Sequence, residues 1–342
     1  MEQQWANKKQ SLQNGLENLG LKNLPEIQIQ SIGPTHLRER MDFVIEDGRI
    51  GLYAKQIEMI VDLPSCPLLT PALQNYYEEF RRIPWPIHKG SFRLRVGPSG
   101  EKGAWLDFSH VDTKILMDEQ KMLLQLSSLG FVEIGQRRKV LEKTPEKFSL
   151  REPVLRCWSK TTYLGQTLSL FGTVGSFSQT GALANQVIVD GVARLTKNMG
   201  HRLSLEYGAG NGNLTFPSMN ESNRVQVIET DLLALQGLRK TAEEFSLGHR
   251  IEILNPKETP DFSKVDLILA NPPRSGLSHF LPKLIETKKP PKNFIYMSCF
   301  PESFLNDAKV LKDLNYRLQE IEIIDQFPHT HHYEILSRWD QS

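Results

Sequence analysis

Hydrophobic and polar residues change their spacing repeatedly after about residue 180. Short apolar runs typical of buried strands cover 203–206, 225–228, 251–254, 265–270 and 293–297. Apolar residues recur every three or four positions, as in amphipathic helices, over 182–199, 232–245 and 301–314. A closing pair of strands is expected at 318–324 and 333–338. Strands that alternate with helices predict an α/β domain with a doubly wound, mostly parallel sheet.

The pattern before residue 160 is different. Short alternating runs, such as 41–46 and 92–96, are separated by Asp-Gly, Gly-Pro and Ser-Gly turns, which predicts antiparallel strands. Helical spacing interrupts these runs at 70–82 and 112–129, so a small β-rich α+β domain is expected. We therefore predict an N-terminal helical arm at 1–35, the β-rich α+β domain at 36–165 and the larger α/β domain at 166–342.

The cysteines and the N-terminal sequence indicate the cellular compartment of the protein. The three cysteines, at positions 66, 157 and 299, have no CxxC spacing, which argues against a disulfide framework and against a structural zinc site. The N-terminus lacks the apolar core of a signal peptide, and no apolar run reaches the roughly 20 residues that span a bilayer. We therefore expect a protein of the reducing cytoplasm that has no membrane association and no bound metal.

Positive and negative charges nearly cancel in the whole chain, but they are unevenly distributed along it. The net charge is only +1, which does not indicate unselective binding of nucleic acid. Residues 81–160, however, contain 16 Lys and Arg against 9 Asp and Glu, an excess of seven that includes Arg93 and Arg95. This stretch is a candidate phosphate-facing surface, although a solvated face with scattered cations fits the charge count equally well.

A glycine-rich turn follows the first strand of the α/β domain. Gly208, Gly210 and Gly212 alternate directly after it, and their lack of a Cβ allows a tight turn and the close approach of a ligand. Glu229 ends the next strand, where a carboxylate can accept hydrogen bonds from both hydroxyls of a ribose. Glu206, just before the turn, suits a cofactor with an ammonium group, which favours S-adenosylmethionine over NAD. An ordinary tight turn is the alternative.

The segment Asn271-Pro-Pro-Arg274 follows a later strand. Proline restricts its own φ and the backbone of the residue before it. We therefore expect the side-chain amide of Asn271 to have a fixed direction. Amino-group N-methyltransferases also use Asn-Pro-Pro, but they place an aromatic residue after it, where this chain has Arg274. A rigid loop without chemistry is the other alternative.

Cys299 and Glu334 are residue types that methylation of uracil at C5 requires. The C5 carbon is a poor nucleophile until a thiolate adds to C6, and a base must later remove the C5 proton so that the thiol can leave. Each residue also has a structural alternative. Most single cysteines are small buried hydrophobes, and Glu334 could pair with Arg338.

Together these segments resemble the signature blocks of the RNA uracil-C5-methyltransferase family, which includes tRNA (uracil-54-C5) and 23S rRNA (uracil-C5) enzymes. The similar segments, in the order and spacing of the family, are Phe177-Ser-Gln-Thr-Gly-Ala-Leu-Ala-Asn-Gln186, Asn271-Pro-Pro-Arg-Ser-Gly276, Ser298-Cys-Phe-Pro301 and Phe327-Pro-His-Thr-His-His-Tyr-Glu334. The resemblance covers most of 36–342 and is strongest from residue 177 onward. It implies a Rossmann-like S-adenosylmethionine-dependent methyltransferase domain with a smaller N-terminal α+β domain.

The resemblance also implies roles for individual residues. Cys299 would be the nucleophile, Glu334 the base, and Asn271 the contact to the target base and to the cofactor site. S-adenosylmethionine would be bound by Gln179, Glu206, Gly208, Gly210, Gly212 and Glu229. RNA, either tRNA or 23S rRNA, would be contacted by Arg274, Arg93, Arg95 and His332. No obligate protein partner is implied.

The chain departs from the family pattern at three positions near these residues. Asn271 replaces the usual Asp, Phe300 replaces an Asn, and Gly181 replaces another Asn. These changes keep open a catalytically weakened RNA-binding relative, and Asn271 keeps open an amino-group N-methyltransferase. Many family members hold an iron–sulfur cluster with four cysteines. Only Cys66 lies in a matching block, so we expect no cluster.

Overall fold

The computed structural model describes residues 1–54, 57–108, 113–221 and 223–342. Contacts between residues divide the chain into two compact units. Unit 1 contains residues 1–34, 161–168 and 183–342, and unit 2 contains 35–160 and 169–182. No helix in the described part of the chain is both long and apolar enough to cross a bilayer.

Unit 1 is built on an eight-stranded sheet with the order β1-β17-β18-β16-β15-β12-β13-β14. Its strands are β1 (Gln28–Ser31), β12 (Leu203–Tyr207), β13 (Arg224–Ile228), β14 (Ile251–Ile253), β15 (Leu267–Ala270), β16 (Asn293–Ser298), β17 (Tyr316–Asp325) and β18 (Glu334–Gln341). All neighbours are parallel except β18, which is antiparallel to β16 and to β17. This confirms the expected α/β fold and its closing strand pair.

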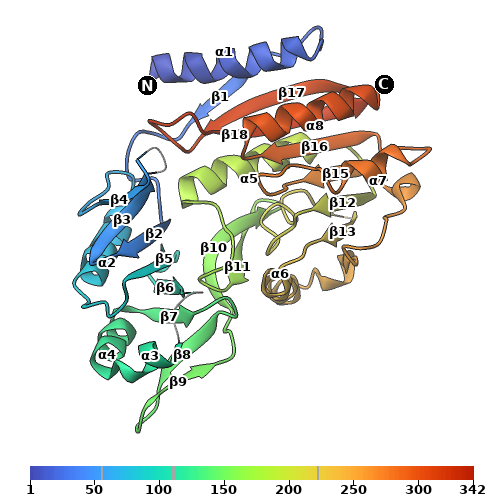
Figure 1. The fold of residues 1–342 in the computed structure, drawn as a ribbon. Helices are drawn as coiled ribbons and strands as arrows, with labels where there is room; N and C mark the ends of the chain where they lie inside the picture. Colours follow the sequence, from blue (N-terminus) through green and yellow to red (C-terminus); the bar gives the residue numbers. More distant parts are fainter. Residues whose placement is uncertain (55–56, 109–112, 222) are drawn as a thin grey trace. The chain divides into compact units, whose positions relative to one another are not determined.

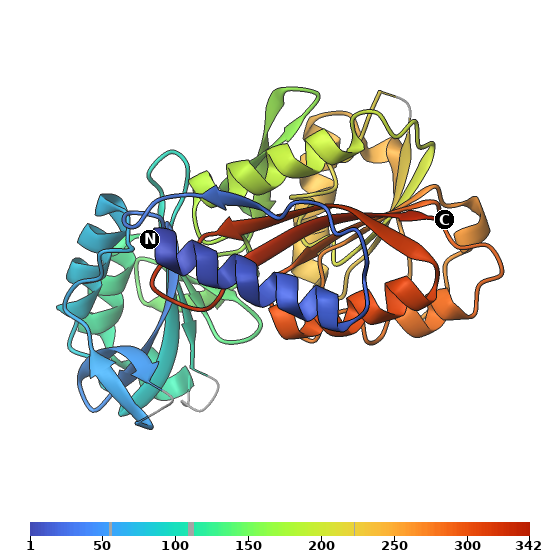
Figure 2. The ribbon, with the colours of Figure 1, turned by 90° about the horizontal axis from the view of Figure 1, so that it is seen from above.

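Helices cover both faces of this sheet (Figures 1 and 2). They are α1 (Glu2–Asn18), α5 (Ala182–Thr196), α6 (Leu232–Glu244), α7 (Leu281–Ile285) and α8 (Pro301–Asp313), with short 3-10 turns at Gly248–Arg250 and Phe262–Lys264. On β15, Leu267 and Leu269 pack with α5, whereas Ile268 and Ala270 pack with α1 and α8. The continuous apolar run of this strand therefore follows from burial on both faces.

The first 34 residues are part of unit 1. Helix α1 buries Leu12 and Leu16 in the core that α8 shares, and β1 pairs with β17 as an additional edge strand. The expected arm at 1–35 thus contributes a helix and a strand to the larger unit. The sequence of this segment predicts the helix. It does not predict β1, because this four-residue strand is mostly exposed and therefore has no clear hydrophobic pattern.

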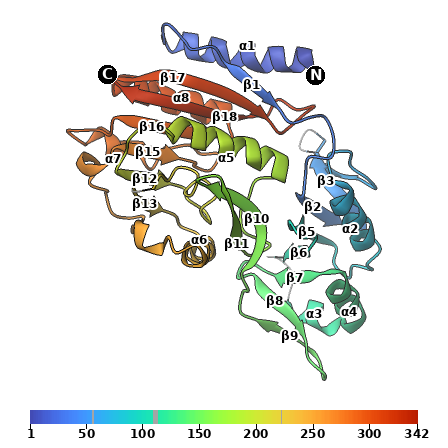
Figure 3. The ribbon, with the colours of Figure 1, turned by 180° about the vertical axis from the view of Figure 1, so that it is seen from behind.

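Unit 2 is the β-rich α+β part of the chain (Figures 1 and 3). Its sheet has the order β4-β3-β2-β5-β6-β7-β8-β9 and is antiparallel except between β6 and β7. The strands are β2 (Arg40–Glu46), β3 (Arg49–Ala54), β4 (Met59–Asp62), β5 (Lys89–Val96), β6 (Lys102–Asp107), β7 (Phe131–Ile134), β8 (Lys139–Lys143) and β9 (Phe148–Arg151). A separate hairpin of β10 (Arg156–Tyr163) and β11 (Gln166–Gly172) contributes residues to both units.

Two helical regions of unit 2 pack on one face of its sheet, where their apolar residues join a single core. Helix α2 (Pro71–Arg81) begins where expected, because the Thr70 side chain accepts a hydrogen bond from the Leu73 amide and a proline occupies the first turn. The second expected helix is divided into α3 (Thr113–Asp118) and α4 (Gln120–Leu129), since Glu119 leaves the helical conformation. Residue 112 of that expected helix lies outside the described residues.

Candidate active site

Five of the candidate groups lie at one edge of the unit 1 sheet, where β12, β13, β15 and β16 end and β18 begins; Figure 1 labels these strands. The turn that begins at Gly208 follows β12, Glu229 follows β13, Asn271 follows β15 and Cys299 follows β16. Because β18 runs in the opposite direction, its first residue, Glu334, lies at the same edge. This is the edge at which open α/β sheets bind their ligands.

The glycine turn requires its glycines for different reasons. All three have positive φ, at +81° for Gly208, +57° for Gly210 and +95° for Gly212. A Cβ on Gly208 would lie 2.3 Å from the Asn271 carbonyl oxygen, so the turn packs directly against the neighbouring strand end. A Cβ on Gly210 would meet no atom within 4 Å. The backbone at Gly210 is therefore open to a ligand, while Gly208 fixes the turn in place.

Glu206 presents an unsatisfied carboxylate oxygen beside this turn. Its side chain is 1% exposed, and Oε2 accepts a 2.5 Å hydrogen bond from the Thr215 hydroxyl. The other oxygen, Oε1, is buried without a hydrogen-bond partner. Burial, and to a lesser extent the negative charge of Glu229, raises the pKa of Glu206 to about 8. A cationic ligand group that reached Oε1 would supply the missing partner and favour the carboxylate form.

Glu229 connects the glycine turn to the end of β13. Its Oε2 accepts a 2.8 Å hydrogen bond from the Gly210 amide. Its Oε1 accepts hydrogen bonds from the amides of Thr230 and Asp231, at 2.6 and 2.8 Å. The carboxylate is thus held in one orientation by backbone donors, and Oε2, which accepts from the Gly210 amide, keeps acceptor capacity for a ligand hydroxyl.

The loop after β15 is held at both of its ends. The backbone N–H of Asn271 donates to the Tyr207 carbonyl oxygen at 2.9 Å, which fixes the beginning of the loop. Asp307 of α8 accepts hydrogen bonds through Oδ2 from the Leu277 amide, at 2.9 Å, and from the Tyr296 hydroxyl, at 2.5 Å. Arg274, between these two anchors, is exposed at the surface. The backbone that carries the Arg274 guanidinium is therefore held in place on both sides.

Cys299 is a partly buried free thiol. Burial, together with the negative charge of Glu334, raises its pKa to about 11, and the positive charge of Arg274 acts in the opposite direction. The thiol is therefore in the electrostatic range of both residues. In the absence of a ligand, this environment keeps the sulfur protonated at neutral pH, so activation of the thiol requires a further change on binding.

Glu334 is buried beside this thiol. The register pairs Ser298 with Ile335 across β16 and β18, so the next residues outward are Cys299 and Glu334. The Gln326 side-chain amide donates a 2.8 Å hydrogen bond to Glu334 Oε1. Burial raises the pKa of Glu334 to about 7, against the opposing effects of Gln326 and Arg274. A carboxylate with this pKa is a stronger proton acceptor than an exposed glutamate.

Two of the arginines expected to contact RNA have structural partners in unit 2. Arg95 is 3% exposed, lies over the Trp158 ring and donates to the carbonyl oxygens of Thr173 and Trp158. The expectation that Arg95 contacts RNA does not agree with this burial, because the Trp158 ring and the Thr173 carbonyl cover this side chain on the face of β5 that it shares with Arg93. Arg93 is only 13% exposed, pairs with Asp42 and donates to the carbonyl oxygens of Gly175 and Ser176.

The remaining expected residues lie in different parts of the chain. His332 is partly exposed and packs against the His331 ring, and burial and the nearby positive charges of His331 and Arg274 lower its pKa. Gln179 belongs to unit 2, whereas the glycine turn belongs to unit 1. No group of three or more His, Cys, Asp or Glu suited to hold a metal ion occurs among the described residues.

Sequence reasoning overlooked several residues that orient the candidate groups. These residues are Gln326, Thr215 and Asp307, and none of them lies in one of the segments that resemble the family. Each is 6% exposed or less and donates to or accepts from a site residue or its loop. A polar residue inside an apolar run was the available signal for Asp307, because α8 otherwise buries Phe304, Ala308 and Leu311.

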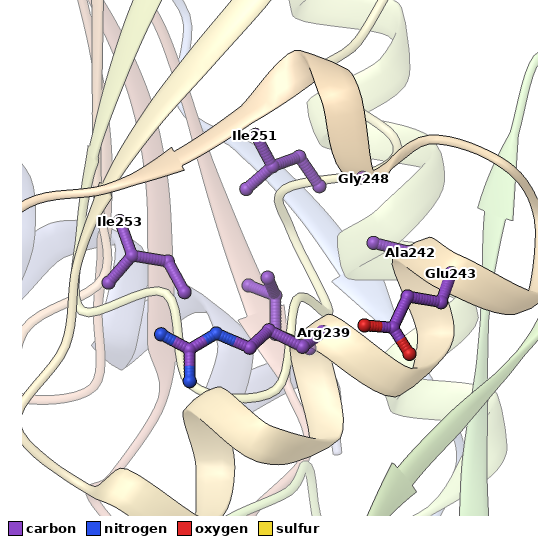
Figure 4. A pocket seen from close by; sticks show the side chains of 7 residues that line it. Arg239, Ala242, Glu243, Gly248, Ile251 and Ile253 are labelled. Carbon is purple, nitrogen blue, oxygen red and sulfur yellow. The ribbon is translucent and has the colours of Figure 1, made fainter.

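A separate hollow of about 450 Å³ lies between α6 and the edge strand β14 (Figure 4). It is lined by Leu238, Arg239, Ala242, Glu243, Gly248, Ile251 and Ile253. None of the candidate site residues is among them, and Arg239 and Glu243 are its charged groups. This hollow is therefore separate from the candidate site at the strand ends.

Comparisons with known proteins identify the relatives of this chain as RNA methyltransferases. A family model described as tRNA (uracil-5-)-methyltransferase matches residues 165–337. An uncharacterised RNA methyltransferase of Bdellovibrio bacteriovorus is 44% identical over 321 residues, which are 91% of this chain and 83% of that protein. The 23S rRNA (uracil(1939)-C(5))-methyltransferase RlmD of Alcanivorax borkumensis is 25% identical over 308 residues, which are 85% of this chain and 66% of that protein.

A solved structure shares the fold. Pyrococcus abyssi tRNA (uracil-54, C5)-methyltransferase, in complex with S-adenosyl-L-homocysteine, superposes with a TM-score of 0.70 at 21% identity. The match covers 99% of this chain and 83% of that one. This likeness extends to both units of the chain and supports the Rossmann-like methyltransferase fold.

Proposed function

Because the chain belongs to the tRNA (uracil-5-)-methyltransferase family, we propose that it forms 5-methyluridine in RNA through a covalent adduct between Cys299 and uracil C6. The observation that carries this proposal is the meeting of a partly buried thiol and a buried carboxyl with raised pKa at one sheet edge. The reaction needs these two groups in succession, one to activate C5 and the other to restore the ring.

Cys299 acts first. The thiolate adds to C6, so that a C6–S bond forms and the electrons of the C5–C6 double bond move toward C5 and O4 as an enolate. The positive charge of Arg274 favours the thiolate and compensates part of the effect of burial. Since C5 and C6 are inaccessible in a base stack, the uridine must enter the site as an extruded base.

Glu334 acts last. After C5 has gained its methyl group, the carboxylate removes the C5 proton, the double bond re-forms, and the C6–S bond breaks to release the thiolate. The Gln326 amide orients the carboxylate for this transfer through its hydrogen bond to Oε1. The raised pKa of Glu334 makes the carboxylate a suitable acceptor for a weakly acidic C–H group near neutral pH.

The glycine turn and its two neighbouring carboxylates fit S-adenosylmethionine. The unsatisfied Oε1 of Glu206 matches an ammonium group, the open backbone at Gly210 allows close approach, and Oε2 of Glu229 retains acceptor capacity for a ribose hydroxyl. When bound, this cofactor supplies an electrophilic methyl group. We assign Gln179 to the same cofactor on the family resemblance alone.

Asn271 is proposed to contact the uracil edge. An amide offers an acceptor for N3–H and a donor for O4, so this residue keeps the hydrogen-bonding pattern needed for uracil although it lacks a carboxylate. The loop from Asn271 to Leu277 is held at its two ends by Tyr207 and Asp307, which fixes the backbone of Asn271. Arg274 and His332, at the exposed side of the site, are the proposed contacts to the RNA backbone.

The proposed substrate is tRNA or 23S rRNA, since the similar proteins include enzymes named for each. Nucleoside mass spectrometry of both RNA fractions from a strain that lacks this protein identifies the substrate. Loss of 5-methyluridine from one fraction, and its return when the wild-type chain is supplied, is the expected result. Unchanged 5-methyluridine in both fractions would contradict this assignment of product.

The covalent step is tested with Cys299→Ala in parallel with Cys66→Ala, a matched change at another partly buried free thiol. Cys299→Ala is expected to abolish 5-methyluridine formation and any denaturant-resistant complex with 5-fluorouridine RNA, while Cys66→Ala retains both. Full activity of Cys299→Ala would rule out the thiol mechanism. RNA binding without methylation by the wild-type protein would instead identify a catalytically inactive relative.

A further inference from the structure

Helix α1 is joined by polar contacts to the segment that leads into Glu334. Lys8 and Trp5 both donate to the Asp325 carboxylate, at 2.8 and 3.0 Å. One turn earlier, the Gln4 side chain donates to the Thr330 carbonyl oxygen and accepts from the His329 amide, at 2.8 and 3.1 Å. A helix from the beginning of the chain therefore contacts the connection between β17 and β18 at several points.

Lys8 makes the central contact. Its side chain is 4% exposed and that of Asp325 is 0% exposed, so the ion pair is removed from water. The ammonium also donates to the carbonyl oxygens of Phe327, at 3.3 Å, and His332, at 2.9 Å. These three acceptors use all three N–H donors of the lysine, and they fix the two ends of the loop relative to each other.

The hydrogen bond that orients the proposed base, from Gln326 to Glu334, joins residues at these same two ends of the loop. Gln326, which donates to Glu334, lies between Asp325 and Phe327, and both of these neighbours are bound by Lys8. At the other end, His332 precedes Glu334 by two residues. Lys8 thus holds the backbone on both sides of the Gln326–Glu334 hydrogen bond without contacting either side chain.

Hydrogen bonds hold the outer part of this connection more than close packing does. A hollow of about 480 Å³ lies between α1 and the loop, lined by Gln4, Asn7, Lys8, Ser11, His329, Thr330, His331 and Tyr333. Van der Waals contact along this stretch is therefore incomplete. Removal of the ammonium would leave the loop free to shift toward the hollow.

We propose that Lys8 is a positioning residue for the removal of the C5 proton, acting through the loop backbone and Gln326 on Glu334. This inference rests on the proposed function. It gives the N-terminal helix a part in the final step of the reaction, in which the covalent adduct is resolved. It requires no direct contact of Lys8 with RNA or cofactor.

The test compares Lys8→Met with Lys9→Met, a matched change at the next residue of the helix. The Lys9 side chain is 36% exposed and pairs with exposed Glu26. Formation of 5-methyluridine by the full-length protein is measured with saturating RNA and S-adenosylmethionine, and covalent protein–RNA complex is quantified on denaturing gels. Cofactor-binding stoichiometry corrects for any unfolded fraction.

Lys8→Met is expected to lower the turnover number by roughly ten- to hundredfold and to raise the fraction of protein in the covalent complex. Misplacement of the base slows proton removal after the adduct has formed, so the adduct accumulates. Loss of fold alone would lower adduct and product together. Lys9→Met is expected to match the wild type, and Lys8→Arg, which keeps a cation with several donors, should recover much of the turnover.

Lys8→Met leaves the buried Asp325 carboxylate without its cation. A double variant, Lys8→Met with Asp325→Asn, also removes this charge, but it does not restore the hydrogen bonds to the carbonyl oxygens of Phe327 and His332. It is expected to be more stable to heat than Lys8→Met and still to accumulate the adduct. Wild-type turnover in either variant would overturn the positioning role while leaving the proposed function intact. Absence of both product and adduct in the wild type would overturn the proposed function and this inference with it.

Discussion

At the scale of single residues, Glu206 shows how tertiary burial changes the chemistry of an ordinary side chain. The sequence places a carboxylate before the glycine turn, but it does not reveal that one oxygen is satisfied by Thr215 and the other has no partner. Burial of such a group disfavours its charged form. The free protein therefore holds Glu206 largely protonated at neutral pH.

Stability is expected to depend on pH through this residue. The pKa of Glu206 is raised from 4.5 to about 8 on folding, so its contribution to stability is present below about pH 4.5 and is lost as the pH rises through 8. Relative to the wild type, Glu206→Gln should gain on the order of 3 kcal/mol in unfolding free energy between pH 5 and pH 8. Urea unfolding of the cofactor-free protein at both pH values measures this change.

Glu244→Gln, an exposed change in α6, is the control. Because Glu133 and Glu334 also have raised pKa values, the wild type retains other sources of pH dependence. The informative quantity is therefore the difference between each variant and the wild type at the two pH values. An equal difference for Glu206→Gln at pH 5 and pH 8 would show that the carboxyl is not desolvated in solution.

At the scale of elements, the turn after β12 depends on close approach as well as on backbone conformation. Gly208 and Gly165 share a φ of +81°, but only Gly208 has a backbone oxygen where a Cβ would lie. The two positions therefore separate the cost of a left-handed residue from the cost of steric overlap.

Gly208→Ala is expected to lower the unfolding free energy by about 1–3 kcal/mol more than Gly165→Ala, because the Asn271 carbonyl must move to admit the methyl group. The same movement should weaken binding of S-adenosylmethionine. Urea unfolding and calorimetric titration measure the two effects. Equal losses in the two variants would mean that the turn and the end of β15 are not in contact in solution.

The elements with strong periodic patterns were predicted well, and those with mixed patterns were not. The sequence predicted α5, α6 and α8 and the central strands of the unit 1 sheet, because burial of one or both faces leaves a clear apolar pattern. It did not predict β1, whose pairing with β17 depends on residues almost 300 positions away. Likewise, the division between α3 and α4 has no proline or glycine to mark it.

At the scale of the whole molecule, the excess of positive charge in 81–160 remains a prediction of an RNA-facing surface. Its members differ in availability, since Arg95 is buried and Arg93 is paired, whereas Arg137 is exposed in the turn after β7. Arginines at a phosphate contact contribute to binding through the release of counterions. The exposed members are therefore the ones to test.

Arg137→Gln is expected to weaken RNA binding and to reduce the slope of log affinity against log salt by about 1. Lys257→Gln, at an exposed position in unit 1, should leave the slope unchanged. Filter binding or fluorescence anisotropy over a range of salt concentrations measures both. An unaltered slope for Arg137→Gln would exclude this residue from the RNA contact.

The sequence alone determined the central strands of the larger unit, the helices α5, α6 and α8, and the identity of the groups at the carboxyl ends of the strands. These features depend on local spacing, because parallel strands deliver the residues that follow them to one edge of the sheet. Only the tertiary structure decided which side chains are desolvated, such as Glu206 and Arg95, and which distant residues are joined, such as Lys8 and Asp325, 317 positions apart. Burial and long-range pairing arise from the packing of several elements together, and no short stretch of sequence contains that information.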